Sequence, residues 1–253
     1  MKLKSLLPIL LAGLIVTGPV TGFPSTAMAG SPQGKATVQA QSLSARQRAI
    51  IAIAAHTADG DLARLKPALA KGLEAGLAVN EIKEILVQLY AYTGFPRSLN
   101  AIHTFMALMD ERQKAGIKDE MGREASPMPK DLDRDQYGAT TRATLGGKDT
   151  VPPPAGYQLF APAIDSFLKE HLFADIFYRD NLDWQSREIA TISALAAMTG
   201  TAGQQRFHMG AAMNTGLDEA QMRAFIELVR SEVGEALANV SSNVFKEILA
   251  KRK

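Results

Sequence analysis

Glu84 and His103 are spaced in this sequence so that they could support proton transfer. Glu84 lies about three helical turns before Gly94, and His103 lies about two turns after Pro96. If the chain turns back at this Gly-Phe-Pro corner, the two side chains come to similar heights on antiparallel helices. Because a carboxylate beside an imidazole can hold and move a proton, the pair is a candidate for general acid–base chemistry.

Tyr92, Arg97 and Asn100 lie at the same corner and are candidate substrate-binding residues. Arg97 begins a predicted helix, where its charge opposes the helix dipole, and this placement favours a role in binding an anion. Structural interpretations stay open. Tyr92 and His103 could pack in the core with their polar atoms bonded. Asn100 could bond the backbone at the turn, and Glu84 could be a solvated charge.

The elements that must position these residues are predicted to be helices. Apolar residues recur at helical spacing over residues 43–58, 62–76, 80–94, 97–116, 159–177, 182–200, 202–216, 218–234 and a last segment to the C-terminus. Ser44 and Asn80 are predicted N-caps, and Gly76, Gly94 and Gly116 are predicted to end helices. Since no long stretch alternates as a strand does, the sequence predicts an all-α fold.

The two halves of the chain resemble each other. Matching residues recur at an offset of 139 and, after a one-residue gap, at an offset of 140. The matches include Arg48 with Arg187, Ile53 with Ile192, Gly76 with Gly216, and Gly94 with Gly234. We therefore predict two tandem helical repeats, residues 42–116 and 157–253, packed about an internal pseudo-twofold. Residues 117–156 are rich in Pro, Gly and charge, and we expect a linker or surface excursion there.

The first residues indicate export. A basic start and an apolar run of 11 residues precede the small residues of Ala27-Met28-Ala29, which is typical of a cleavable signal peptide at 1–29. An uncleaved anchor is the alternative. Residues 30–41 would form a flexible leader, and the mature protein would be periplasmic or secreted with no membrane contact. Removing the signal removes two basic residues and no acidic ones, which leaves no net charge and predicts no nucleic-acid surface.

Composition limits the chemistry further. The chain has no cysteine, no HExxH and no Asp-rich calcium loop, so we predict no metal and no cofactor. One alternative stays open, in which His103, His208 and Glu84 form a site of two imidazoles and one carboxylate. His56 and His171 have no such context and are interpreted as structural or surface residues.

Four motifs occur in order across the two halves. They are GLAVNEIKE at 76–84, YTGFP at 92–96, SRE at 186–188 and QQRFHMGAAMNTGL at 204–217. Together they resemble the carboxymuconolactone decarboxylase family, which includes the alkylhydroperoxidase D type. The resemblance spans roughly residues 43–110 and 160–250, with Gln205 where the family has Leu. It implies two decarboxylase-like repeats.

The resemblance also bears on redox chemistry. Peroxidases of this family carry a Cys-x-x-Cys pair between a Glu and a His. Counted from Glu84, the cysteine positions hold Pro96 and Leu99, and the His position holds His103. Thiol peroxidase activity is therefore not expected, because both thiols are missing.

The family pattern is divided between the repeats. Its motif His is His208 in the second half but Ala68 in the first, whereas Glu84 corresponds to Ala224 in the second half. The resemblance therefore suggests one composite catalytic site in which Glu84 and His208 meet across the pseudo-twofold. The alternative is that each repeat lost its site separately and the two residues never meet.

The function implied is acid–base decarboxylation or isomerisation of a small anionic lactone or keto acid. Arg97 would hold a carboxylate, His103 or His208 would be the acid, and Glu84 would orient the His. Arg187 and Glu188, which open a helix, are interpreted as scaffold ion pairs.

The alternative to an enzyme is a non-catalytic binding or assembly module that keeps the fold. Family resemblance implies a homo-oligomer, a dimer, trimer or hexamer, with residues 105–110 as one candidate surface and core packing as the other use of that stripe. The sequence does not identify the substrate.

Overall fold

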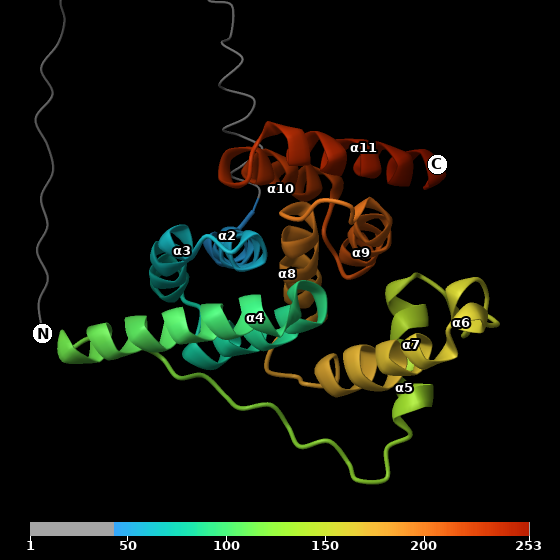
Figure 1. Ribbon diagram of the computed structural model, residues 1–253, viewed down its shortest axis with the longest axis horizontal. Coiled ribbons are helices and arrows are strands. Elements are labelled where there is room, and N and C mark those ends of the chain that lie inside the picture. Colours follow the sequence, from blue (N-terminus) through green and yellow to red (C-terminus); the bar gives the residue numbers. More distant parts are fainter. Residues whose placement is uncertain (1–42, 253) are drawn as a thin grey trace, which may run out of the picture. The chain divides into compact units, whose positions relative to one another are not determined.

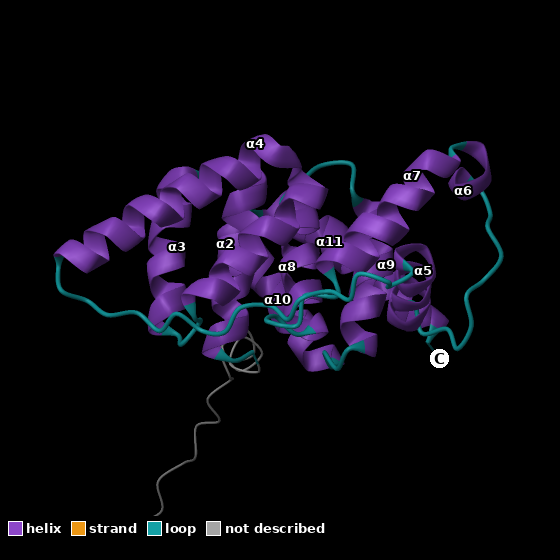
Figure 2. Ribbon diagram, turned by 90° about the horizontal axis from the view of Figure 1, so that it is seen from below, coloured by secondary structure: helices purple, strands orange, loops and turns teal. Residues whose placement is uncertain are grey.

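The computed structural model describes residues 43–252, and every regular element in that range is a helix (Figures 1 and 2). The all-α prediction is therefore confirmed for this part of the chain. The predicted signal peptide at 1–29 and leader at 30–41 lie outside the described residues. No helix between residues 43 and 252 combines the length and hydropathy that a membrane span requires.

The first repeat contains α2 (Ala45–Asp59), α3 (Leu62–Glu74) and α4 (Val79–Lys114). The predicted cap at Ser44 is confirmed, because its hydroxyl accepts the Gln47 N–H and the Gln47 side chain accepts the Ser44 N–H. The predicted cap at Asn80 is wrong. Asn80 lies inside α4, and its side-chain amide donates to the Gly122 carbonyl.

The corner at Gly94 is confirmed and lies within α4. Gly94 has φ 78° and ψ 159°, a conformation that residues with a Cβ rarely adopt. Beyond it, the Ser98 hydroxyl donates to the Leu86 carbonyl at 2.8 Å. Twelve residues of straight helix would separate these groups by about 18 Å, so the second part of α4 turns back beside the first.

The interval expected to be a linker contains a helix, α5 (Arg134–Leu145). It packs against the π-helix η1 (Phe167–Ile176) at Gly138, where a Cβ would lie 1.8 Å from the Lys169 carbonyl oxygen. Asp133 caps α5 by accepting the Gln136 N–H at 3.0 Å. The low helix propensity and high charge of this segment predicted a linker, but packing against η1 stabilises it as a short helix.

The second repeat follows α5. Its helices are α6 (Tyr157–Phe160), α7 (Pro162–Ser166), η1, α8 (Trp184–Ala196), α9 (Ala202–Asn214), α10 (Glu219–Glu232) and α11 (Glu235–Lys251). Gly234 separates α10 from α11 with φ 127°, as Gly94 divides α4.

The core of the described chain lies where α2 and α8 pack together (Figure 1). Ile53 and Ile192, which match in the two repeats, are both fully buried there. Packing around this pair is reciprocal, since α4 of the first repeat contacts α8, and α10 of the second contacts α2. Such an exchange is what a pseudo-twofold would produce, although the symmetry itself stays a prediction. A later helix of each repeat therefore packs against the first long helix of the other repeat.

Candidate functional site

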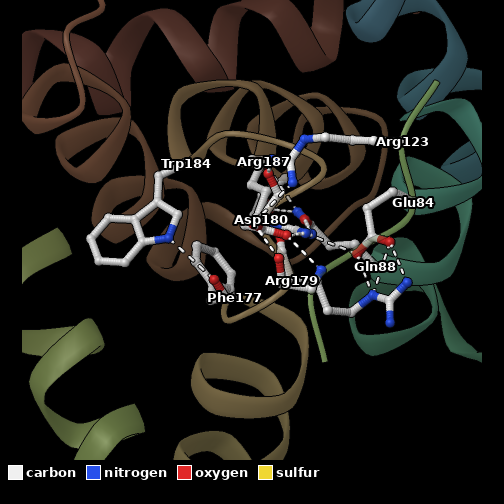
Figure 3. A network of polar contacts seen from close by, with 10 residues as sticks. Glu84, Gln88, Arg123, Phe177, Arg179, Asp180, Trp184 and Arg187 are labelled. Carbon is white, nitrogen blue, oxygen red and sulfur yellow. Dashed lines mark hydrogen bonds and ion pairs between the residues drawn. The ribbon is translucent and has the colours of Figure 1, made fainter. Parts of the chain in front are cut away.

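A buried ion-pair network joins α4 to α8 (Figure 3). The Glu84 carboxylate accepts from Arg187 Nη2 at 2.8 Å and from Arg179 Nε at 2.9 Å to each oxygen. Gln88, one turn after Glu84, accepts from Arg187 Nη1 at 2.8 Å and donates to the Thr191 hydroxyl at 2.9 Å. Glu84, Gln88 and Arg187 are each at most 1% exposed, whereas the Arg179 side chain is 40% exposed and forms the solvent-facing end of the network.

Two opposing effects act on the Glu84 carboxyl. Burial would raise the pKa of Glu84, but hydrogen bonds and charges from Arg179 and Arg187 outweigh it and hold the pKa below its ordinary value. Burial lowers the pKa of Arg187, and the Glu84 carboxylate partly offsets that effect. An ionised carboxylate bound by two guanidinium groups has little capacity to accept a proton near neutral pH. Glu84 is thus placed to hold Arg187.

A second pair lies one residue further along α8. His208 on α9 has its Nδ1 2.8 Å from Glu188 Oε2. The Glu188 side chain is fully buried, and the His208 side chain is 7% exposed. A carboxylate on Nδ1 fixes the proton there and leaves Nε2 as the nitrogen that can exchange protons with another molecule. This Glu–His pair has the geometry of an oriented acid or base.

Tyr92, from α4 of the first repeat, contacts the Glu188–His208 pair. Its ring meets the His208 ring edge-on, with centroids 5.4 Å apart. Burial and the nearby Glu188 charge raise the pKa of Tyr92, so its hydroxyl stays protonated. Phe207 covers His208 on another side, with ring centroids 5.0 Å apart. The pair is therefore enclosed by aromatic rings from α4 and α9.

Three buried polar atoms in this centre lack a hydrogen-bond partner among residues 43–252. They are the Tyr92 hydroxyl, Arg187 Nε and Glu188 Oε1. Buried polar groups are rarely left unpaired, and such groups concentrate where a molecule binds or reacts. We call the set of Tyr92, Arg187, Glu188 and His208 the second-repeat centre.

Three residues predicted at the corner lie away from this centre. Arg97, Asn100 and His103 are exposed on the second part of α4. The Arg97 guanidinium donates to the Ala58 carbonyl at the end of α2, which accounts for its place at a helix start. In the described contacts none of the three touches Glu84, Tyr92 or His208.

Glu84 and His208 make no direct contact, and each binds one of two adjacent residues on α8. Glu84 binds Arg187, and His208 binds the next residue, Glu188. The first repeat contacts His208 through the ring of Tyr92, and the composite site of Glu84 and His208 stays a prediction. Within residues 43–252 no group of three or more His, Asp or Glu side chains is arranged to hold a metal ion, and the alternative metal site of His103, His208 and Glu84 is not formed there.

Sequence reasoning did not identify Glu188 as the partner of His208. Glu188 is interpreted from the sequence as a scaffold residue because the neighbouring Arg187 recurs as Arg48 at the matching helix start. In the structure Arg187 binds Glu84, whereas Glu188 binds His208. The available signal was the spacing of 20 residues between Glu188 and His208 on consecutive helices joined by Gly200. Arg179 gave no signal, because it lies 95 residues from Glu84 and reaches it only through the fold.

A cavity of about 510 Å³ lies at the start of α8. It is lined by Trp184 and Gln185, and by Leu145 from α5 and Thr215 after α9. The Trp184 indole donates to the Phe177 carbonyl at 3.2 Å, and the Arg187 guanidinium lies 5.9 Å from the centre of the Phe177 ring (Figure 3). Trp184, which lines the cavity, and Phe177 thus connect its wall to Arg187.

Comparison with known families gives one result. Residues 33–105 and 162–247 match the carboxymuconolactone decarboxylase family, which confirms the resemblance inferred from the motifs. The two matched regions follow the two repeats. Among curated proteins, none matches this chain.

Proposed function

Because the chain belongs to the carboxymuconolactone decarboxylase family, we propose that it is a non-redox enzyme that transfers a proton at the second-repeat centre. Its substrate class would be a small anionic lactone or keto acid, and its reaction decarboxylation or isomerisation. The observation that carries the proposal is the buried His208–Glu188 pair at 2.8 Å, beside a buried tyrosine hydroxyl that has no partner among the described residues.

The proposed decarboxylation assigns each group one task. The bond between a substrate carbon and its carboxylate breaks, carbon dioxide leaves, and the electron pair passes into the neighbouring carbonyl as an enolate. The protonated Tyr92 hydroxyl donates to the enolate oxygen and stabilises its charge. His208 Nε2 gives its proton to carbon and regains one from water, while Glu188 stabilises the imidazolium ion.

Glu84 is a positioning residue in this proposal. Its carboxylate fixes the Arg187 guanidinium, whose positive charge lies near the Tyr92 hydroxyl. That charge favours an anionic substrate and an anionic transition state. Arg97, Asn100 and His103 have no part in it, since they lie on an exposed face.

A specific observation favours the second candidate function, an assembly module. The second part of α4 exposes Phe95 (63%), Leu99 (48%) and Met106 (58%), while Phe105 and Leu108 from the predicted stripe are buried. Large apolar side chains exposed along one helix are typical of an association surface. Under this alternative the chain forms a homo-oligomer through α4 and catalyses nothing.

Proton exchange in D2O separates the two candidates. The purified protein is incubated with lactone acids and keto acids, and deuterium at carbon and carbon dioxide release are measured by NMR. We expect turnover in the wild type and a loss of at least 100-fold in His208→Ala and Glu188→Gln. His103→Ala is the matched control, because it removes an exposed imidazole.

Ligand binding supplies the second readout. Trp184 is the single tryptophan, so its fluorescence reports on ligands that enter beside α8. Absence of deuterium incorporation, together with unchanged Trp184 fluorescence for every acid, would reject the enzyme. A Phe95→Glu variant that dissociates an oligomer in light scattering would then favour the assembly module.

A further inference from the structure

The first repeat has a hollow where the second repeat has its polar centre. The offsets of 139 for α2 with α8, and of 140 for α3 with α9 and α4 with α10, pair every residue of one centre with a counterpart. Glu188, Thr191 and His208 correspond to Ala49, Ala52 and Ala68. Three polar side chains are thus replaced by methyl groups.

The residues that enclose the second-repeat centre also have smaller counterparts around the hollow. Trp184 corresponds to Ala45, Phe207 to Pro67 and Tyr92 to Glu232. The result is a cavity of about 530 Å³ between α2, α3 and α10, and all six of these counterparts line it. Substitution by small side chains at matching positions therefore accounts for the hollow.

This hollow carries a polar pair of its own. His56, which corresponds to Leu195 in the second repeat, is only 2% exposed and lines the cavity. Its Nε2 lies 3.2 Å from Glu232 Oε2, and its Nδ1 lies 3.4 Å from Asp59 Oδ2. The loss of an ancestral site would not by itself explain a buried imidazole with two carboxylate partners.

The charges around the hollow favour an anion. Arg64 binds the Glu232 carboxylate at 2.8 Å, so the one acidic group that lines the cavity is already neutralised. Lys71 also lines the cavity, and no carboxylate lies within ion-pair distance of it in the part of the chain that the structure describes. An arriving cation would meet paired acids, whereas an arriving carboxylate would meet an available ammonium group.

The walls between these charges are apolar. They come from the alanines of α2 and α3, with Ile51 and Leu228. A cavity of several hundred Å³ with apolar walls and a few polar groups at one side has the size and lining of a small-molecule site. We propose that this cavity, the first-repeat hollow, binds a small carboxylate with an apolar body, with its carboxylate at Lys71. The proposal is independent of the reaction proposed for the second-repeat centre.

Benzoate and hexanoate are the probes, and benzamide is the uncharged isostere. NMR titration of the full purified protein follows the His56 ring and the alanine methyl groups of α2 and α3. We expect saturable shifts with both acids, and at least tenfold weaker binding of benzamide. Lys71→Ala should weaken benzoate at least threefold, and Lys83→Ala, an exposed lysine on α4, should not change it.

Filling the hollow tests its position. Ala68→Leu should abolish benzoate binding, and the site tolerates a larger side chain because its counterpart is His208. If Ala68→Leu does not fold, Ala52→Leu fills the same cavity from α2. His208→Ala should leave benzoate affinity and its shifts at His56 unchanged.

Three results would overturn the proposal. The first is equal affinity for benzoate and benzamide. The second is the absence of shifts at His56 and the alanine methyls with either acid. The third is benzoate binding that survives a folded Ala68→Leu variant or that changes Trp184 fluorescence, since Trp184 lies at the other centre.

Discussion

Two centres at matching places in the two repeats have opposite character. In the second repeat, Glu188 and His208 form a buried pair enclosed by Tyr92 and Phe207. In the first repeat, the same helix positions surround a cavity of about 530 Å³ with His56 at its wall. The helices that carry these residues match in sequence between the repeats, so side-chain size and charge account for much of the difference between a closed polar centre and a cavity.

The difference also shows how a duplicated chain can divide two tasks. A site made from both repeats needs one set of polar residues on each, and here α8 and α9 supply one set and α4 the other. The reverse combination, α2 and α3 with α10, has Ala49 and Ala68 instead. Under the two proposals made above, one centre would carry the proton-transfer groups and its counterpart would bind a different ligand.

The largest expected effect comes from breaking the ion pair that only the second-repeat centre has. Glu84→Gln leaves the buried Arg187 without its charge partner and should cost about 3–5 kcal/mol in the free energy of unfolding. Urea denaturation measures it. The counterpart of Glu84 is Ala224, so the first repeat has no equivalent weakness.

A double replacement is the control for that loss. Glu84→Leu with Arg187→Met removes both charges and should recover most of the stability, because a buried pair can be replaced by apolar side chains of similar volume. A Glu84→Gln variant within about 1 kcal/mol of the wild type would show that Arg187 is not held by this contact.

The next effect concerns the pair of Glu188 and His208. His208→Ala leaves Glu188 buried without its partner and should cost about 2–3 kcal/mol. Adding Glu188→Ala gives the second repeat the residues that the first already has, and the double variant should lose less than the sum of the single losses. Strict additivity in denaturation would mean that the 2.8 Å contact contributes nothing.

Acid should weaken the second-repeat centre selectively. The pKa of Glu84 is lower in the folded protein than in the unfolded chain, so the unfolded state binds more protons and stability rises with pH across that range. The contribution is complete above the unfolded pKa and is lost as pH falls through the folded value.

Denaturation of the wild type and Glu84→Gln at a series of pH values checks this expectation. The gap between the two should be widest near pH 7 and should narrow below about pH 4. A gap that is constant with pH would mean that the Glu84 charge is not what stabilises the fold.

Much of the fold could be predicted from local signals. The helix ends at Gly76, Gly94 and Gly116 all have positive φ, and the Ser44 cap forms as expected. Helix α5 could not be found in this way, because a polar 12-residue helix depends on docking against η1 more than on its own propensity.

The candidate site was harder to predict because its contacts cross the repeats. Tyr92 and His208 were identified from the sequence, and they do meet. Arg97 and His103 were grouped with Glu84 by their spacing, but helix spacing does not say which face is covered, and they lie on the exposed face. Arg179 as the partner of Glu84, and Glu188 as the partner of His208, can be identified only once the packing of the helices is known.

The smallest expected effect bears on the hollow itself. Ala68→Leu places an apolar side chain in the first-repeat cavity and should stabilise the protein by about 0.5–1 kcal/mol, because filled cavities gain packing contacts. His103→Ala, on an exposed face, should change stability by less than about 0.5 kcal/mol and serves as the baseline. Thermal unfolding measures both. A clear loss of stability in Ala68→Leu would mean that the hollow cannot accept a side chain, and its difference from the second-repeat centre would then lie in the backbone rather than in side-chain size.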